Sequence, residues 1–184
     1  MVEQQEPEVV ILNSNIYSVE EFAITFEQPL NLSPEIIPDD RAQLRQALLE
    51  EEVSELREAI EKRSLPDILD ALCDIEYIVS GTILEYGLHN IFDASFAEVH
   101  ESNLRKVFEN PDEVDEAIAM YKERGVDVEV KTLVTEEGQE VFYLKRLPDG
   151  KILKPKGWKA PDLAYILERF KEAEDEQTRI EAQA

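Results

Sequence analysis

The sequence predicts an all-α fold, a helical bundle of about four to five helices, with a small β-hairpin in the C-terminal third. Two long segments, residues 40–62 and 65–86, repeat apolar side chains at intervals of three and four residues, the spacing of a helix that packs on one side. After residue 125 the pattern changes to an alternation of apolar and polar residues that is typical of strands. A chain of 184 residues has room for one hydrophobic core, so we expect a single domain over residues 1–184.

The N-terminal part is expected to hold a tail, a short helix and a connector. Residues 1–8 are mostly polar and acidic and predict a flexible tail. Ser18 and Glu21 have the spacing of a capping box, which predicts a short helix that begins there. Three prolines then predict an extended connector, at positions 29, 34 and 38.

A helical hairpin is predicted to follow. The first helix spans about Asp40 to Lys62. Ser64 is a suitable N-cap for the second helix, because its side chain can accept a hydrogen bond from an N–H group of the first turn. Pro66 also fits the first turn of this helix. This second helix is expected to last to about Tyr86, just before a glycine.

The C-terminal half predicts shorter elements. A third helix is expected over residues 93–108, and Asn110 is a suitable N-cap for a fourth that ends at Gly125. Residues 126–134 and 141–144 alternate around a turn and predict a β-hairpin. We expect the fourth helix and this hairpin to be an addition to the helical core rather than a separate domain.

The chain is expected to end in a last helix that begins near Pro161. Residues 175–184 are rich in Glu, Asp and Gln and predict a second flexible tail. The start of the chain has no basic segment followed by an apolar one, and no apolar run approaches the roughly 20 residues that cross a bilayer. We therefore expect a cytoplasmic protein.

Composition excludes several partners. The formal net charge of −23 argues against nucleic acid and against anionic membranes. The single cysteine, Cys73, cannot form an internal disulfide, and its place on an apolar helix favours a core residue over a reactive thiol.

Acidic side chains lie where the two long helices should be apolar. Glu52 falls inside the apolar arc of the first helix, and Glu51 and Glu55 fall along its edge. Asp70 and Asp74 share one strip of the second helix. Clustered carboxylates taken out of water need cations, and all-oxygen ligands favour Mg²⁺ or Mn²⁺ over Zn²⁺. The alternative is a solvated acidic face without a metal.

Both acidic helices are apolar over more than half of their circumference, which a two-helix hairpin cannot bury. We expect dimerisation with a second copy of the chain to complete the bundle. The alternative is that the third, fourth and last helices cover these faces within one chain.

Several segments, in chain order, resemble one enzyme superfamily. They are EEVSEL at 51–56, DALCDIEYIVSGT at 70–82, EVHESNLRK at 98–106, DGKILK at 149–154, and Trp158. Together they resemble the all-α nucleoside triphosphate pyrophosphohydrolases, which include the MazG-like proteins, the dimeric dUTPases and the phosphoribosyl-ATP pyrophosphohydrolases. Relative to the shorter members, residues 111–146 look like an insertion.

The resemblance implies Mg²⁺-dependent hydrolysis of a nucleoside triphosphate to a monophosphate and pyrophosphate. The family pattern has E-E-x-x-E on the first helix and E-x-x-D on the second. In this chain Ala71 stands where the glutamate of E-x-x-D would be. Asp70, one residue earlier, is the expected substitute. The implied metal ligands are therefore Glu52, Glu55, Asp70 and Asp74, and the implied catalytic residues are Glu51, Glu52 and Glu55, with Glu51 holding a second metal or positioning the water.

The implied substrate-binding residues lie further along the chain. Asn103 and Lys106 share one face of the third helix, where an amide and an ammonium group can hold phosphate or sugar oxygens. Lys154 and Trp158 would close over the substrate, with plain core packing as the alternative for the tryptophan.

The resemblance favours a deoxynucleotide such as dUTP and leaves dCTP and oxidised purine nucleotides open. It implies a homodimer or a tetramer. A non-catalytic nucleotide- or metal-binding module, or an interaction module, on the same fold is the alternative, motivated by Ala71. A di-iron bundle needs Glu-x-x-His pairs, and neither His89 nor His100 has a glutamate three residues before it.

Overall fold

The structure, a computed structural model, describes residues 14–182 and confirms a mostly helical fold with one small antiparallel hairpin. The described part contains α1 (Ser14–Thr25), α2 (Asp39–Lys62), α3 (Leu65–Glu85), α4 (His89–Leu104), α5 (Pro111–Glu123), β1 (Val128–Val134), β2 (Glu140–Arg146) and α6 (Leu163–Glu181). The predicted tail at residues 1–8 lies outside the described residues.

The chain divides into two compact units, where the sequence led us to expect one domain. Among the described residues, the first unit comprises residues 14–93 and 169–182, and the second unit comprises residues 94–168. The boundaries fall inside α4 and α6. Each unit is described below by itself.

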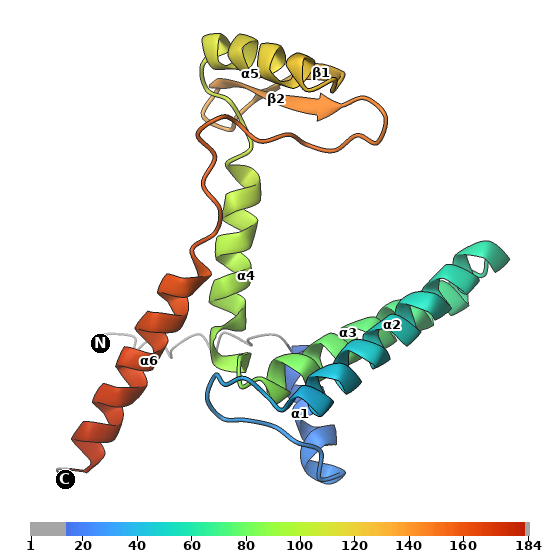
Figure 1. Ribbon diagram of the computed structural model, residues 1–184, viewed down its shortest axis with the longest axis vertical. Coiled ribbons are helices and arrows are strands. Elements are labelled where there is room, and N and C mark those ends of the chain that lie inside the picture. Colours follow the sequence, from blue (N-terminus) through green and yellow to red (C-terminus); the bar gives the residue numbers. More distant parts are fainter. Residues whose placement is uncertain (1–13, 183–184) are drawn as a thin grey trace, which may run out of the picture. The chain divides into compact units, whose positions relative to one another are not determined.

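In the first unit, α2 and α3 form the predicted helical hairpin (Figure 1). Arg63 ends α2 in the left-handed conformation, with φ of 54°. The Ser64 side chain then accepts a hydrogen bond from the Asp67 N–H at 3.4 Å, and Pro66 occupies the first turn of α3. Local capping signals therefore set the position of the turn, as the sequence predicted.

The core of the first unit lies where α1 packs on the C-terminal half of α3. Its buried residues are Ile16, Val19, Ile83 and Leu84. Gly87 ends the helix with φ of +66°, and a Cβ there would lie only 2.1 Å from the Ser33 carbonyl oxygen. The Asn31 N–H donates to the Leu84 carbonyl oxygen and the Glu35 N–H to the Tyr86 carbonyl oxygen, both at 3.1 Å, and these bonds fasten the proline-containing connector to the end of α3.

In the second unit, α5 lies across the β1–β2 hairpin (Figure 1). The strands pair in antiparallel register, with Val130 opposite Leu144. Asn110 caps α5 by accepting a hydrogen bond from the Asp112 N–H at 2.9 Å, as predicted. The buried core joins the helix, the strands and the following loop through Phe108, Val114, Ala117, Leu144 and Leu153.

Three boundaries differ from the prediction. α1 begins at Ser14 rather than Ser18, because Ile16 and Val19 on its first turns are buried. α4 spans residues 89–104 rather than 93–108, because Phe108 is extended and forms a bridge with Phe142. α6 continues to Glu181, so most of the segment predicted to be a flexible tail is helical.

None of the helices that the structure describes has both the length and the apolar character needed to cross a membrane.

Candidate functional site

The five predicted carboxylates all lie on the α2–α3 hairpin, within the first unit. Glu52 is half-buried on the stripe of α2 that also carries the buried Ala59. Asp74 is half-buried on the matching stripe of α3, one turn after the buried Ala71. The other three are exposed along the edges of these stripes, namely Glu51, Glu55 and Asp70. Helical periodicity thus places two of the carboxylates toward the helix–helix contact.

The charges of this cluster act on one another. The pKa of Glu52 is raised, first by burial of its carboxyl group and then by the negative charges of Asp74, Glu55, Glu51 and Asp70. The structure therefore brings the five side chains into one electrostatic neighbourhood around Glu52. A bound cation would relieve this repulsion.

The donor set fits a hard divalent cation, because every group in it is a carboxylate oxygen. Among the described residues, no three His, Cys, Asp or Glu side chains lie close enough together to hold a metal ion. Three of the carboxylates, those of Glu51, Glu55 and Asp70, are exposed on the helix surface. Their roles as metal ligands and catalytic groups stay predictions.

Ala71 marks the departure from the family pattern, and its surroundings are informative. Its side chain is 3% exposed and lines a shallow cavity of about 280 Å³ between α2 and α3. Glu55 and Asp70 line the same cavity. A longer side chain at position 71 would extend into this space, so Asp70 supplies a carboxylate beside the place that a glutamate would fill.

The predicted substrate-binding residues lie in the second unit and form two contacting pairs. Lys106 donates a hydrogen bond from Nζ to Asn103 Oδ1 at 2.6 Å. Lys154 places its Nζ over the ring of Trp158, 3.6 Å from the centroid, in a cation–π contact. The Trp158 indole N–H donates to the Ser102 carbonyl oxygen at 2.7 Å. The tryptophan is half-buried rather than a core residue.

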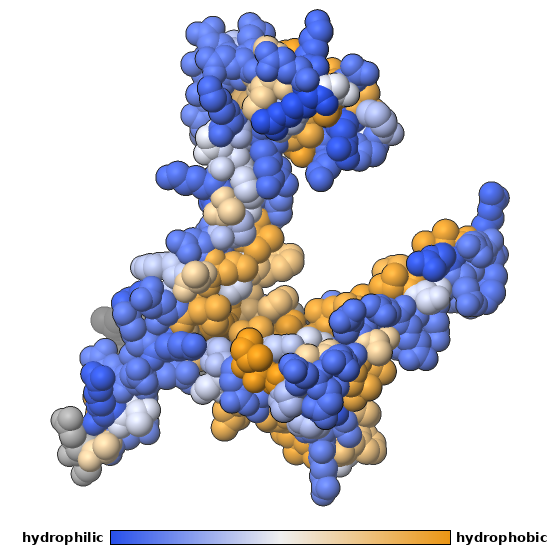
Figure 2. All heavy atoms as spheres, viewed as in Figure 1, coloured by the Kyte–Doolittle hydropathy of each residue, from blue (hydrophilic) through white to orange (hydrophobic). Residues whose placement is uncertain are grey.

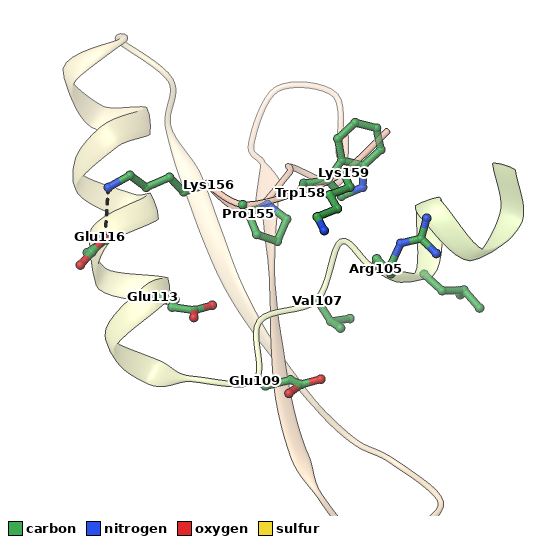
Figure 3. A pocket seen from close by; sticks show the side chains of 11 residues that line it. Arg105, Val107, Glu109, Glu113, Glu116, Pro155, Lys156, Trp158 and Lys159 are labelled. Carbon is green, nitrogen blue, oxygen red and sulfur yellow. Dashed lines mark ion pairs between the residues drawn. The ribbon is translucent and has the colours of Figure 1, made fainter. Parts of the chain in front are cut away.

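A pocket of about 810 Å³ in the second unit contains residues that the sequence analysis missed (Figure 3). Trp158 lines it, together with Leu104, Arg105, Val107, Glu109, Glu113, Glu116, Pro155, Lys156, Gly157 and Lys159. A signal for it was present in the sequence, because residues 145–159 contain six Lys or Arg residues and one Asp in an otherwise strongly acidic chain.

Residues 19–103 match the family model described as phosphoribosyl-ATP pyrophosphohydrolase. The resemblance to the all-α pyrophosphohydrolases is confirmed. The matched pyrophosphohydrolase segment is somewhat less than half of the chain. A comparison with curated proteins finds no significant match.

The segment that matches the family model divides the predicted site residues into two groups. It contains all five carboxylates of α2 and α3 and ends at Asn103. Lys106, Lys154 and Trp158 lie beyond it, as do all the residues that line the second-unit pocket. The matched range therefore covers the carboxylate cluster and leaves out the pocket, and the roles of the individual residues stay predictions.

Proposed function

We propose that this protein is a Mg²⁺-dependent nucleoside triphosphate pyrophosphohydrolase, which cleaves the α–β phosphoanhydride to release a monophosphate and pyrophosphate. The observation that carries the proposal is the cluster of five carboxylates around Glu52, inside the segment that matches a pyrophosphohydrolase family. The match supports hydrolysis of a pyrophosphate bond in a nucleotide-like substrate. A triphosphate substrate, with a deoxynucleotide such as dUTP preferred, is the more specific part of the proposal.

The carboxylates of the hairpin have different tasks in this reaction. Glu52, Glu55, Asp70 and Asp74 hold Mg²⁺, or Mn²⁺ in its place. The bound ion supplies positive charge against phosphate oxygens, whose negative charge must be offset for water to attack. Glu51 is exposed, so it remains accessible to orient the attacking water and to accept its proton.

The test is hydrolysis by the full chain with Mg²⁺ and a panel of nucleotides that includes dUTP, dCTP and an oxidised purine triphosphate. We expect monophosphate and pyrophosphate in equal amounts, and no product in EDTA. Diphosphate with inorganic phosphate would place the cleavage at another bond. If no nucleotide were hydrolysed with Mg²⁺ or Mn²⁺, the alternative of a non-catalytic module, motivated by Ala71, would replace the proposal.

We also propose that a second copy of the chain covers the hairpin formed by α2 and α3. Apolar side chains gather along this hairpin (Figure 2), and those with relative exposures between 42% and 76% are Leu44, Val53, Ile60, Leu65, Leu69 and Leu72. Exposed apolar patches of this kind are typical of protein–protein interfaces. A homodimer, or a tetramer built from it, would bury them.

Leu69→Lys is expected to convert the dimer to a monomer, because a lysine ammonium cannot be buried in an apolar interface without a large desolvation cost. Light scattering after gel filtration measures the mass, which should fall from twice the chain mass of 21.2 kDa to that mass itself. Leu133→Lys is the matched control, because Leu133 is 49% exposed but lies on β1. A monomeric parent, or a dimer that Leu69→Lys leaves intact, would contradict the proposal.

A further inference from the structure

The hairpin of the second unit has one covered edge and one open edge. On the covered edge, Phe142 of β2 exchanges two hydrogen bonds with Phe108, at 2.7 and 2.8 Å, and the Leu144 carbonyl oxygen accepts one from the Leu153 N–H at 2.9 Å. Among the described residues, no strand or bridge pairs with the opposite edge, which belongs to β1. A further strand can therefore join this sheet only beside β1.

The backbone groups that point out of this open edge follow from the hydrogen bonds at the two ends of the hairpin. The Leu147 N–H donates to the Asp127 carbonyl oxygen at 3.0 Å, and the Thr135 N–H donates to that of Gln139 at 2.8 Å. Because bonding alternates along an antiparallel pair, the N–H and C=O groups of odd-numbered residues point to β2 and those of even-numbered residues point outward. No outward group has a hydrogen-bond partner that the structure describes, and these groups belong to Val128, Val130, Thr132 and Val134.

The side chains of β1 do not protect this edge. Natural sheets protect open edges with unpaired lysines, prolines or bulges. β1 contains no proline, and its register with β2 continues without a bulge. Its single lysine, Lys131, forms an ion pair with Glu129 at 2.6 Å. The apolar side chains of Val130, Leu133 and Val134 are 41%, 49% and 69% exposed, so a further strand would also cover apolar surface.

We propose that the open edge binds β1 of a second copy of the chain, antiparallel, about a twofold axis at Val130. In this register the outward groups of Val130 meet those of the partner's Val130, and those of Val128 meet those of the partner's Thr132. Each of these pairs exchanges both of its hydrogen bonds. The two hairpins then form one continuous sheet in the order β2–β1–β1–β2, whose outer edges are the covered ones. The contact is symmetric and closes on itself.

Charge complementarity favours a second copy in this register. About an axis at Val130, Glu129 of each chain lies directly opposite the partner's Lys131, in the kind of pair that brings side chains closest. An axis at Lys131 would place this lysine opposite its own copy, and an axis at Glu129 would do the same for the glutamate. Like charges directly opposite each other are destabilising. The register about Val130 is therefore favoured over both of its neighbours.

The net charge of the chain weakens this contact only in part. Of the formal charge of −23, residues 94–168 carry −5, from 16 acidic and 11 basic residues. Exposed charges more than about 8 Å apart are largely screened at physiological salt. Because the strands are short and the buried area is small, we expect a dissociation constant on the order of 100 μM. Gel filtration dilutes the protein below this concentration, so the contact leaves the masses measured there unchanged.

Sedimentation equilibrium of the full chain at physiological salt tests this pairing. We expect the weight-average mass to rise about 1.5-fold between about 10 μM and about 1 mM chain, as the expected dissociation constant requires. Lys131→Glu should abolish the rise, because glutamates then lie opposite glutamates, and Glu129→Lys should abolish it through opposed lysines. An equal mixture of the two variants should restore the rise, because every opposed pair between them joins a lysine to a glutamate.

Lys122→Glu is the matched control, because it makes the same change of charge at an exposed position on α5. It should associate as the parent does. A parent mass that stays constant with concentration would leave the edge to a different protein and overturn the proposal. Association that persists in Lys131→Glu alone, or a mixture that stays unassociated, would overturn it as well. Because the readout is a ratio of masses, it does not depend on the α2–α3 contact or on hydrolysis.

Discussion

Replacing Glu52 with glutamine is expected to lower the rate of nucleotide hydrolysis by more than about a hundredfold. Mutation of groups that only orient metal ligands already lowers metal affinity or activity by roughly 10–100-fold, and Glu52 is a proposed ligand itself. Glu52 is half-buried, and its pKa is raised first by burial and then by the charges of the four other carboxylates. The amide keeps the size of the side chain but loses its negative charge, so it holds a divalent cation poorly. Initial rates at saturating Mg²⁺ measure the effect.

The same variant is expected to remain folded, and the direction of the pKa shift gives the reason. Because the folded protein raises the pKa of Glu52, the folded state binds more protons than the unfolded state just above the ordinary glutamate pKa. Stability of the metal-free protein therefore falls as the pH rises through that range, and the penalty is fully present at neutral pH. Glutamine removes this penalty, which for a partly exposed group is less than about 1 kcal/mol. The variant should melt no lower than the parent in EDTA.

Mg²⁺ should raise the melting temperature of the parent and not that of Glu52→Gln, because only a ligand bound to the folded state stabilises it. Glu50→Gln is the matched control, because Glu50 lies on the exposed side of the same helix, where its carboxylate accepts a hydrogen bond from Gln46 Nε2 at 2.8 Å. Its activity and its response to Mg²⁺ should equal those of the parent. If Glu52→Gln kept full activity, the metal site would have to lie elsewhere.

Sequence alone predicted the elements that local signals determine. Ser64 and Asn110 cap their helices through neighbouring N–H groups, so the starts of α3 and α5 were predicted within a residue or two. The extent of α4 was mispredicted, because Phe108 leaves the helical pattern to form a bridge with Phe142, 34 positions along the chain. Contacts of that kind depend on tertiary packing and leave no local pattern.

The candidate site shows the same division. Helical periodicity was enough to predict that the carboxylates share one hairpin, with Glu52 and Asp74 on the facing stripes and the other three along the edges. The second-unit pocket was not, because Glu113 on α5 and Lys159 after β2 meet only once the β-hairpin has folded between them. Its one local sign, the basic run of residues 145–159, was visible but indicated no cavity.

The sequence analysis also missed Glu85, a buried acid at the C-terminal end of α3. It joins α3 to the start of α2, at the end of the hairpin opposite the turn. Glu85 is 3% exposed, and its carboxylate accepts two hydrogen bonds from Arg41, at 2.6 and 3.1 Å. Arg45 lies 3.8 Å from the same carboxylate and donates to the Ile78 carbonyl oxygen at 2.5 Å. A Cβ at Gly81 would lie 2.7 Å from the Arg45 guanidinium, so this arginine passes close over Gly81 and would have to shift if a larger residue stood there.

Glu85→Gln is expected to destabilise the protein by about 3 kcal/mol, the lower end of the range for breaking a buried ion pair, because Arg41 keeps partial exposure. The amide leaves two neighbouring guanidinium groups without a counter-charge. The hydrogen bond to Glu85 is the main cause that raises the pKa of Arg41, whereas burial lowers the pKa of Arg45. Urea denaturation followed by circular dichroism measures the loss, which corresponds to a decrease in melting temperature of roughly 6–12 °C for a chain of this size.

Glu98→Gln separates the effect of burial from that of charge. It also removes a carboxylate paired with an arginine, since Arg105 lies 2.8 Å away, but both of these side chains are substantially exposed. Exposed pairs contribute less than about 1 kcal/mol, so this variant should unfold close to the parent. If the two variants lost equal stability, burial of Glu85 would not be the reason for its effect. A large loss confined to Glu85→Gln would identify the Arg41–Glu85–Arg45 cluster as the contact that keeps α2 in register with α3, and hence keeps Glu52 opposite Asp74.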